Sequence, residues 1–385
     1  MCNPDWGREE WLQVFDLVIP DIIWGIENWY NPNAPLPIRN AQYPHIMIPT
    51  GGSGGKIKFA VHTWETLTAS VKGFQEYFQV DKINSFCVLP LYHVSGLMQF
   101  MRCFTTGGKL VILPFKQIVS ENNDNVENHL DILDFFISLV PTQLERLLKK
   151  SDLTKWLSEF KTVLLGGAPA WDELLEKARF HHIKLAPTYG MTETASQIAT
   201  MKPEDFLRGK IGCGKVLPHA KIQIIGEKGE ILKSHQVGNI NIQAESLALG
   251  YYPLNDEIQS FLQIDDLACL DEQGYLDIVG RNSDKIITGG EKVYPAGIEA
   301  AIRKTEMVAD VCVIGVADKY WGQIVTAIYV PKKADVLNGE IQLLLKDKIS
   351  NYKIPKIWIS VNSLPRNSQG KINRQKLYQI ADKYV

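Results

Sequence analysis

The chain has 385 residues, of which 45% are hydrophobic and 10% aromatic, so it can bury a large core in roughly two or three domains. Its 41 basic and 43 acidic residues give a formal net charge of -2, which excludes the positive field that holds a nucleic-acid backbone. We therefore expect small-molecule partners and no nucleic acid.

The six cysteines are widely spaced and form no CxxC pair, as expected for reduced thiols in a cytosol. The eight histidines form no HExxH pattern, which disfavours a transition metal held by the protein. The first residues, MCNPDWGREEW, do not place an apolar region after a basic one, and every apolar run is shorter than ~18 residues. We therefore expect a cytoplasmic protein without stable membrane insertion.

Short β-rich apolar runs alternate with helical patterns from about Ile46 to His182. The runs SFCVLPLY and KTVLLGG predict buried strands that end in turns, whereas AWDELLEKARF places its apolar residues at the 3.6-residue period of a helix. This alternation predicts a mixed α/β fold built in layers.

From Lys210 to Gly280 the pattern changes to short strands with turn signals, as in KIQIIGEKGEIL and CLDEQGYLDIVG, and predicts a small antiparallel sheet or barrel. After GRNSDKIITGG, the helix PAGIEAAIRK and the strands DVCVIGVA and TAIYVP indicate a smaller α+β unit. We predict a large domain over residues 1–280, a hinge at 281–285 and a small C-terminal lid domain over 286–385.

A glycine-rich loop with two lysines, IPTGGSGGKIKFAVHT, follows an apolar approach. It is not a P-loop, because Thr50 stands five residues before Gly55 and Ile57 follows Lys56 where a magnesium-binding hydroxyl belongs. The fingerprint GxGxxG fails as well, since position 57 is not glycine. The loop is either an ordinary turn or a flexible cradle whose N–H groups, hydroxyls and lysines follow a polyphosphate.

Six segments in order resemble signatures of the adenylate-forming family of acyl-CoA synthetases, luciferases and peptide-synthetase adenylation domains. They are TGGSGGKIK, which matches the family phosphate loop [ST]SGTTGxPK, then PLYHVSG, GGAP, YGMTE, GYLDIVGRNSDKIITGGEKVYP and LPRNSQGK. The resemblance extends from about Ile46 to Leu377. It implies a large ATP- and acyl-binding domain, a mobile lid, ATP and CoA as co-substrates and Mg²⁺ as cofactor.

The resemblance also implies catalytic roles. Lys371 matches the family lysine that bridges the carboxylate and the α-phosphate, and Glu193 matches the magnesium ligand. Thr192 is expected to bond the α-phosphate, and His93 to lie where the acyl group enters. The structural alternatives are a solvated lysine for Lys371, caps of a helical turn for Thr192 and Glu193, and a structural histidine for His93.

Nucleotide selection is assigned to other positions by the same resemblance. Asp266 aligns with the aspartate that accepts hydrogen bonds from both ribose hydroxyls, Arg281 is expected to reach the ribose or phosphate, and Tyr189 to stack on the base. Gly289 and Gly290 are candidates for the wall of the CoA tunnel, against an ordinary β-turn. The expected ATP/AMP contacts are Thr50, Gly52, Ser53, Gly55, Lys58, Gly167, Ala168, Pro169, Tyr189, Gly190, Met191, Asp266 and Arg281.

Within the family, YGMTETASQIAT and PLYHVSGL most resemble the o-succinylbenzoate-CoA ligases of menaquinone and phylloquinone biosynthesis. The implied substrate is an aromatic keto-diacid, which is first adenylated and then joined to CoA. The implied acyl pocket comprises His93, Leu97, Gly166, Ser196 and Gln197. Another aryl- or medium-chain acyl-CoA ligase is the alternative within the class.

Several positions depart from the family pattern. Gly51 and Gly54 replace hydroxyl residues of the phosphate loop, Ile57 replaces its proline, and IDD stands in place of TGD before the ribose aspartate. Only about fifty residues precede the phosphate loop, so we expect a shortened first subdomain. These departures keep open a non-catalytic nucleotide-binding protein, and the sequence leaves open a homodimer.

Overall fold

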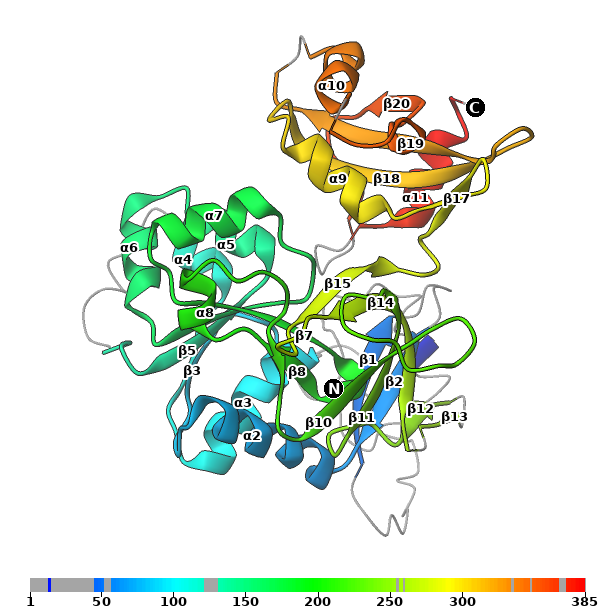
Figure 1. Ribbon diagram of the computed structural model, residues 1–385. Helices are drawn as coiled ribbons and strands as arrows, with labels where there is room; N and C mark the ends of the chain where they lie inside the picture. Colours follow the sequence, from blue (N-terminus) through cyan, green and yellow to red (C-terminus); the bar gives the residue numbers. More distant parts are fainter. Residues whose placement is uncertain are drawn as a thin grey trace, which may run out of the picture. The chain divides into compact units, whose positions relative to one another are not determined.

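The computed structural model describes residues 13–14, 45–51, 57–120, 131–253, 256–258, 260–333, 336–346, 348–366 and 372–384. The chain forms two compact units (Figure 1). The first comprises Met1–Gly167, Ile183–Ile222 and Ile242–Leu262, and the second comprises Ala168–His182, Gln223–Asn241 and Gln263–Val385.

The first unit is built on a seven-stranded sheet with the order β4-β3-β5-β6-β7-β8-β9. Strands β4, β3, β5, β6 and β7 are parallel, whereas β8 and β9 are antiparallel additions. This arrangement confirms the α/β fold expected from the alternation of strands and helices. The strands are β3 (Asn84–Cys87), β4 (Leu110–Ile112), β5 (Phe135–Leu139), β6 (Thr162–Leu165), β7 (Leu185–Met191), β8 (Ser196–Thr200) and β9 (Lys215–Val216).

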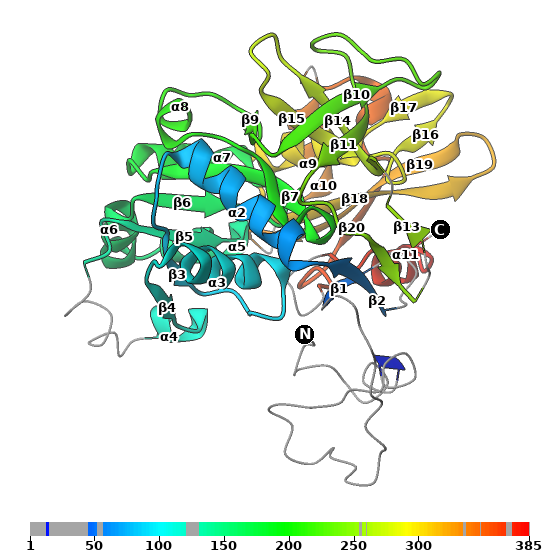
Figure 2. The same ribbon diagram turned by 90° about the horizontal axis from the view of Figure 1, so that it is seen from below.

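Helices cover both faces of this sheet (Figures 1 and 2). Phe136 on β5 packs on Phe74 of α2 with ring centroids 5.0 Å apart, whereas Phe86 on β3 packs on Trp156 of α6 at 5.5 Å. The two strand residues point to opposite faces, because side chains alternate along a strand. The helices of this unit are α2 (Trp64–Phe78), α3 (Val94–Thr106), α4 (Phe115–Val119), α5 (Pro141–Leu147), α6 (Ser151–Glu159) and α8 (Pro203–Leu207).

The start of α2 is fixed by a capping box. The backbone N–H of Thr66 donates to the Thr63 hydroxyl at 3.3 Å, and the backbone N–H of Thr63 donates to the Thr66 hydroxyl at 3.1 Å. The reciprocal bonds satisfy donors that a helix N-terminus otherwise leaves unpaired. They set where the chain turns from strand β2 (Ile57–His62) into the helix.

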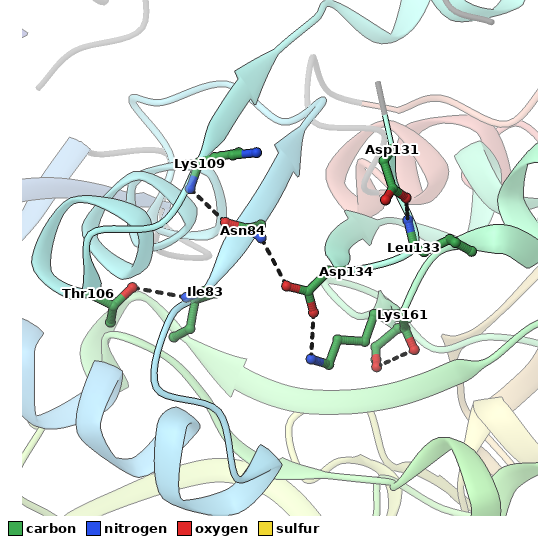
Figure 3. Close-up of polar contacts among 9 residues, drawn as sticks. Ile83, Asn84, Thr106, Lys109, Asp131, Leu133, Asp134 and Lys161 are labelled. Carbon is green, nitrogen blue, oxygen red and sulfur yellow. Dashed lines mark hydrogen bonds and ion pairs between the residues drawn. The ribbon is translucent and has the colours of Figure 1, made fainter. Parts of the chain in front are cut away.

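The amino ends of four parallel strands are joined by polar contacts (Figure 3). Asp134, before β5, accepts from the Asn84 amide at 3.1 Å and from the Lys161 ammonium at 2.7 Å. The side-chain oxygen of Asn84 in turn accepts from the backbone N–H of Lys109, before β4, at 2.7 Å. These contacts lie at the edge of the sheet opposite to the ends where the strands finish.

Two four-stranded sheets follow the orders β1-β2-β12-β13 and β10-β11-β14-β15. The second contains the sheet expected between Lys210 and Gly280. The remaining strands of the two sheets are β1 (Ile46–Gly51), β12 (Gly250–Tyr252), β13 (Asp256–Glu257), β10 (Ala220–Ile225), β11 (Gly238–Ala244), β14 (Leu262–Leu270) and β15 (Leu276–Arg281).

A five-stranded sheet in the second unit has the order β17-β16-β19-β18, with β20 parallel to β19. Its strands are β16 (Ile286–Thr288), β17 (Glu291–Val293), β18 (Val308–Asp318), β19 (Gly322–Pro331) and β20 (Ile357–Ser360). The unit also contains α7 (Asp172–Phe180), α9 (Pro295–Arg303), α10 (Asn338–Leu345), the 3-10 turn η3 (Asn351–Lys353) and α11 (Arg374–Ala381). Helix α9 lies within PAGIEAAIRK, and strands β18 and β19 contain DVCVIGVA and TAIYVP, as expected from the sequence. Among the described residues, no helix is both long and apolar enough to cross a bilayer.

Candidate active site

Three predicted site segments lie where the parallel strands end. His93 precedes α3 in the connection after β3, Gly166 and Gly167 follow β6, and Tyr189 lies near the end of β7. Ala168 and Pro169 continue the segment after β6, and Gly190 and Met191 complete β7. Strand order reverses between β3 and β5, and in open α/β sheets ligands bind outside the carboxyl ends of strands at such a reversal.

Glu193 lies just beyond β7, in the 3-10 turn η2 (Thr192–Thr194), with only 8% of its surface exposed. Its Oε1 atom accepts a hydrogen bond from the Thr50 hydroxyl at 3.3 Å and another from the Tyr251 hydroxyl at 3.0 Å. The carboxylate thus contacts residues of β1 and β12 that are far away in sequence. This arrangement does not fit a carboxylate that only caps its own turn.

Lys58 joins the same group of residues from β2. Its Nζ atom lies 3.4 Å from the centroid of the Tyr251 ring, a cation–π distance. Thr50 and Lys58 are register partners on β1 and β2, so both side chains are positioned by the hairpin that carries the predicted phosphate loop. The structure therefore brings together three predicted residues, Thr50, Lys58 and Glu193, around one tyrosine.

Thr192 is held through its backbone by a buried histidine. The Nε2 atom of His62 lies 2.8 Å from the Thr192 carbonyl oxygen, and Nδ1 lies 3.0 Å from the Thr66 hydroxyl. A carbonyl oxygen can only accept, so Nε2 carries the proton of a neutral ring. Burial lowers the pKa of His62, which favours the same neutral form. The histidine ties the start of α2 to the turn that presents Glu193.

The end of β7 requires glycine at position 190. A Cβ atom there would lie 2.0 Å from the backbone oxygen of Ser196, at an irregularity in the β7–β8 register. Ala195 and Ser196 have φ angles of 50° and 82°, a left-handed conformation that L-residues adopt infrequently. The predicted pocket residue Ser196 is therefore placed by a tight reversal at Ala195 and Ser196, which follows the turn of Glu193.

Two further predicted pocket residues, Leu97 and Gln197, are buried at 7% and 4% exposure. The Gln197 amide donates to the Thr200 hydroxyl at 2.9 Å, and its oxygen accepts from Nη2 of Arg102 at 3.2 Å. Arg102 was not among the predicted site residues. Its guanidinium carbon lies 4.3 Å from the Phe74 ring centroid, and the side chain is 2% exposed.

Burial lowers the pKa of Arg102 to about 10, so the guanidinium remains charged at neutral pH. Within the described ranges, no carboxylate forms an ion pair with it, and its Nε atom has no hydrogen-bond partner. A buried cation without a counter-charge costs several kcal/mol. Among the described residues, this charge lies against the Gln197 oxygen and the Phe74 ring.

In the second unit, Asp266 and Arg281 are brought together by strand pairing. They are register partners on β14 and β15, and the Arg281 Nε atom lies 3.1 Å from Asp266 Oδ1. The Asp266 side chain is 16% exposed, whereas that of Arg281 is 62% exposed. An ion pair of this exposure contributes little to stability, so its conformation can change when a ligand offers other partners.

We expect Asp266→Ala to weaken ATP binding by roughly 1.5 to 3 kcal/mol, the cost of charge-assisted hydrogen bonds to the ribose. Titration calorimetry with a non-hydrolysable ATP analogue measures the effect. Asp265→Ala is the matched control, because neighbouring residues of β14 point to opposite faces of the strand. If only the Asp265 variant lost affinity, the IDD segment would be misaligned by one residue.

Gly289 and Gly290 form the two-residue turn between β16 and β17, with φ angles of 58° and 83°. Two positive φ angles are the requirement of a type I′ hairpin, which accounts for the glycines locally. A Cβ atom on Gly289 would also lie 3.0 Å from the Trp321 ring. Contact with CoA stays a prediction for these residues.

Lys371, Gly52, Ser53 and Gly55 lie outside the described residues. The nearest described residues on either side of Lys371, Arg366 and Ile372, form an antiparallel bridge. The guanidinium of Arg366 lies 2.6 Å from Asp310, whose other oxygen lies 3.3 Å from Arg303. The base of the segment that carries Lys371 is thus attached to β18 and α9.

Sequence reasoning missed His62, Arg102 and Tyr251. Arg102 could have been identified from the local sequence. Its charge lies nine residues after His93, at a position that the helical period places on the buried face of an otherwise apolar helix. Tyr251 could not have been identified in this way, because its hydrogen bond to Glu193 crosses 58 residues of sequence.

Comparison with known proteins gives two family matches. The model of the AMP-binding enzyme family matches residues 9–252, and that of the AMP-binding enzyme C-terminal domain matches residues 297–371. A 2-succinylbenzoate–CoA ligase of Oceanobacillus iheyensis is 35% identical over 341 residues, which are 86% of this chain and 68% of the relative. One of Listeria monocytogenes is 35% identical over 339 residues, with 85% and 68% covered.

Solved structures are similar as well. The o-succinylbenzoate CoA synthetase of Bacillus subtilis, in complex with its acyl-adenylate intermediate, has a TM-score of 0.76 and 29% identity over 86% of this chain and 68% of its own. The same enzyme with ATP and magnesium ion has a TM-score of 0.75, 29% identity, and coverage of 86% and 69%. With matched segments that span both units and include the residues around Glu193, the chain belongs to the AMP-binding enzyme family.

Proposed function

We propose that the protein is a 2-succinylbenzoate–CoA ligase of menaquinone or phylloquinone biosynthesis. In the first step a carboxylate oxygen of o-succinylbenzoate attacks the α-phosphorus of ATP and pyrophosphate leaves. In the second step the CoA thiolate attacks the carbonyl carbon of the adenylate and AMP leaves. The observation that carries the proposal is the convergence of Thr50, Lys58 and Glu193 at the carboxyl edge of the sheet, in a chain similar to ligases of that name.

The residues around Glu193 fit Mg²⁺. This ion takes oxygen ligands and is bound by one or two carboxylates together with substrate phosphates. Glu193 supplies one buried carboxylate, and within the described part of the chain no group of three or more acidic, histidine or cysteine residues forms a closed metal cage. The bound ion would neutralise phosphate charge. Glu193 would hold it, and the Thr50 and Tyr251 hydroxyls orient the carboxylate.

The remaining catalytic roles are assigned from the charges of the attacking and leaving groups. Two anions meet in the first step, so cations and N–H donors must converge on the α-phosphate. We assign this work to Lys371 and Thr192, with Lys58 placed for the departing pyrophosphate. Asp266 selects the ribose, and Arg281 is its partner until the nucleotide binds.

A diacid substrate is supported by Arg102. The succinyl carboxylate is the one adenylated, so the benzoate carboxylate must be held as an anion away from the nucleotide. Arg102 is a buried guanidinium, still charged and without a carboxylate partner among the described residues, and it contacts Gln197 of the predicted acyl pocket. We propose that Gln197 and Arg102 recognise this second carboxylate.

Arg102→Met is expected to lower kcat/KM for o-succinylbenzoate on the order of 100-fold, because the second carboxylate would be buried without a counter-charge. Activity with benzoate, which lacks the second carboxylate, should change little. The substitution leaves the buried Gln197 oxygen without this donor, so the melting temperature is expected to fall modestly. Pyrophosphate release with both acids measures the effect.

The control is Arg146→Met, which removes an exposed arginine from α5. Equal loss with benzoate and o-succinylbenzoate in the Arg102 variant would contradict the proposed recognition. Arg102→Lys should recover part of the discrimination, because it restores the charge without the planar fork.

For the second step we propose that the lid rotates about residues 281–285, withdraws Lys371 and presents Gly289 and Gly290 to CoA. Two contacts hold the hinge and the glycine turn to neighbouring elements. Arg374 of α11 lies 2.8 Å from Asp284 in the hinge, and the backbone N–H of Gly289 donates to the Trp321 carbonyl at 2.9 Å. The exposed Trp321 ring, with Lys356 Nζ 2.9 Å from its centroid, lies beside the same turn.

A pyrophosphate-release assay with a panel of acids tests the proposed function. Strong preference for o-succinylbenzoate supports it, preference for monoacids would indicate another acyl-CoA ligase, and ATP binding without release would indicate a non-catalytic protein. We propose a cytosolic location, supported by the free thiols of all five cysteines that the structure describes.

A further inference from the structure

The backbone directly after the turn η2 is held in a strained conformation. Ala195 and Ser196 have φ angles of 50° and 82°, although neither is glycine. Residues with a side chain keep such angles only where the surrounding structure over-determines them, and this kind of strain gathers at functional sites. The contacts that fix the turn therefore also decide where Thr192 and Glu193 lie.

Two side chains from β2 and α2 hold the two ends of the turn. The Thr192 carbonyl oxygen accepts a hydrogen bond from Nε2 of His62 at 2.8 Å. The Ala195 carbonyl oxygen accepts one from the Ser70 hydroxyl, also at 2.8 Å. These bonds cross 130 and 125 residues of sequence, so they form only in the folded chain.

The connection between β11 and β12 holds the middle of the turn. The Thr194 carbonyl oxygen accepts from the Ser246 hydroxyl at 2.9 Å. The Glu193 carbonyl oxygen accepts from the backbone N–H of Ala248 at 2.8 Å, and Tyr251, three residues later, bonds the Glu193 carboxylate. Each of the four consecutive carbonyl groups from residue 192 to residue 195 thus has a donor from a distant segment.

The three side chains that supply these donors are completely buried. His62, Ser70 and Ser246 are each 0% exposed, as are Thr194 and Ala195 in the turn. A buried carbonyl group that loses its only long-range donor has given up its bonds to water without replacement, which is costly. Loss of one donor is therefore expected to move the turn rather than leave it in place.

Beyond the proposed activity, we infer that His62, Ser70 and Ser246 are positioning residues for adenylation. The hydrogen bonds that they donate reach carbonyl groups of the turn, so they act on the reaction through Thr192 and Glu193. These roles rest on those proposed for Thr192 and Glu193, whichever acid is activated. Together the three donors keep the strained turn in the one conformation that presents the carboxylate to a phosphate-bound cation.

His62→Leu removes one donor with little change in volume, whereas His62→Gln keeps an N–H group near the position of Nε2. Binding of α,β-methylene-ATP to the full chain is measured by titration calorimetry at a series of magnesium concentrations. In His62→Leu and in S70A/S246A, the magnesium concentration for half-maximal binding should rise on the order of tenfold, because a misplaced carboxylate holds the cation less well. His62→Gln should recover most of this loss.

The reference and the control separate this role from others. Glu193→Gln should shift the magnesium dependence in the same direction. Thr154→Val removes a buried hydroxyl that donates to the Lys150 carbonyl at 2.8 Å in α6, and it should leave the magnesium dependence unchanged. A shift in Glu193→Gln but not in His62→Leu or S70A/S246A would overturn the positioning role and leave the role of Glu193 standing. No shift in any of these variants would overturn both roles.

Hydrogen–deuterium exchange of the chain without nucleotide and magnesium gives a second measurement. Amides of residues 191–197 should exchange on the order of tenfold faster in His62→Leu and S70A/S246A, because the turn opens locally, whereas those of β5 and β6 keep their rates. Ser246→Ala removes a single oxygen atom and should act in the same direction if His62→Leu does not fold. Unchanged exchange in the turn, or an equal increase throughout the sheet, would overturn the positioning role.

Discussion

Lys371→Ala is expected to lower adenylate formation on the order of 1000-fold while thioester formation from a supplied acyl-adenylate stays nearly unchanged. The lysine is assigned to the attack on the α-phosphate, where charge accumulates between two anions. In the proposed lid position for thioester formation, Lys371 lies away from the adenylate. Pyrophosphate release measures the first half-reaction, and CoA consumption with synthetic adenylate measures the second.

Lys376→Ala is the matched control, because this exposed lysine lies in the first turn of α11, close to Lys371 in sequence. It should leave both half-reactions intact. Equal losses in both half-reactions of the Lys371 variant would refute the two-pose mechanism, although the adenylation site itself could stand.

Glu193→Gln should lower kcat with magnesium-ATP on the order of 100-fold, because the amide keeps the shape of the side chain but removes the charge that holds the cation. The KM for the acid should change much less, since the carboxylate contacts Thr50 and Tyr251 rather than the predicted acyl pocket. Initial rates over a range of magnesium concentrations measure the effect. Raised magnesium should restore part of the lost rate.

Two other variants make this result specific. Tyr251→Phe removes one hydrogen bond to the same carboxylate and should cost activity in the same direction but by a smaller factor. Glu176→Gln, on the exposed face of α7, should be silent. If Glu193→Gln had no effect on the magnesium dependence, Glu193 would not be the metal ligand.

Much of the fold was predictable because it follows from local periodicity. SFCVLPLY overlaps the last three residues of β3, KTVLLGG contains β6, and AWDELLEKARF contains α7, since apolar spacing distinguishes strand from helix over such lengths. PAGIEAAIRK similarly contains α9, with proline at its first turn. The order of the strands in the sheets was not readable, because pairing is decided by contacts between distant segments.

The site likewise contains residues that the sequence identifies and partners that only the folded chain brings together. Glu193 and Asp266 could be identified because their neighbours in sequence resemble family motifs. The hydroxyl of Thr50, by contrast, meets Glu193 across 143 residues, and Arg102 meets Gln197 across 95. No short stretch contains such a pair, so the counter-charge and hydrogen-bond partners of a buried group emerge only from the folded chain.

Asn84, Asp134 and Lys161 connect the amino ends of the strands, whereas the predicted site residues lie at the carboxyl ends. One edge aligns the strands and the opposite edge carries the chemistry, so each can be altered with little disturbance of the other. Substitutions at Asn84 and Asp134 therefore act away from the residues proposed for catalysis, and the exposed Asp134–Lys161 pair contributes little to stability. Substitutions near Gln197 that change substrate preference should likewise leave the contacts of Asn84, Asp134 and Lys161 intact.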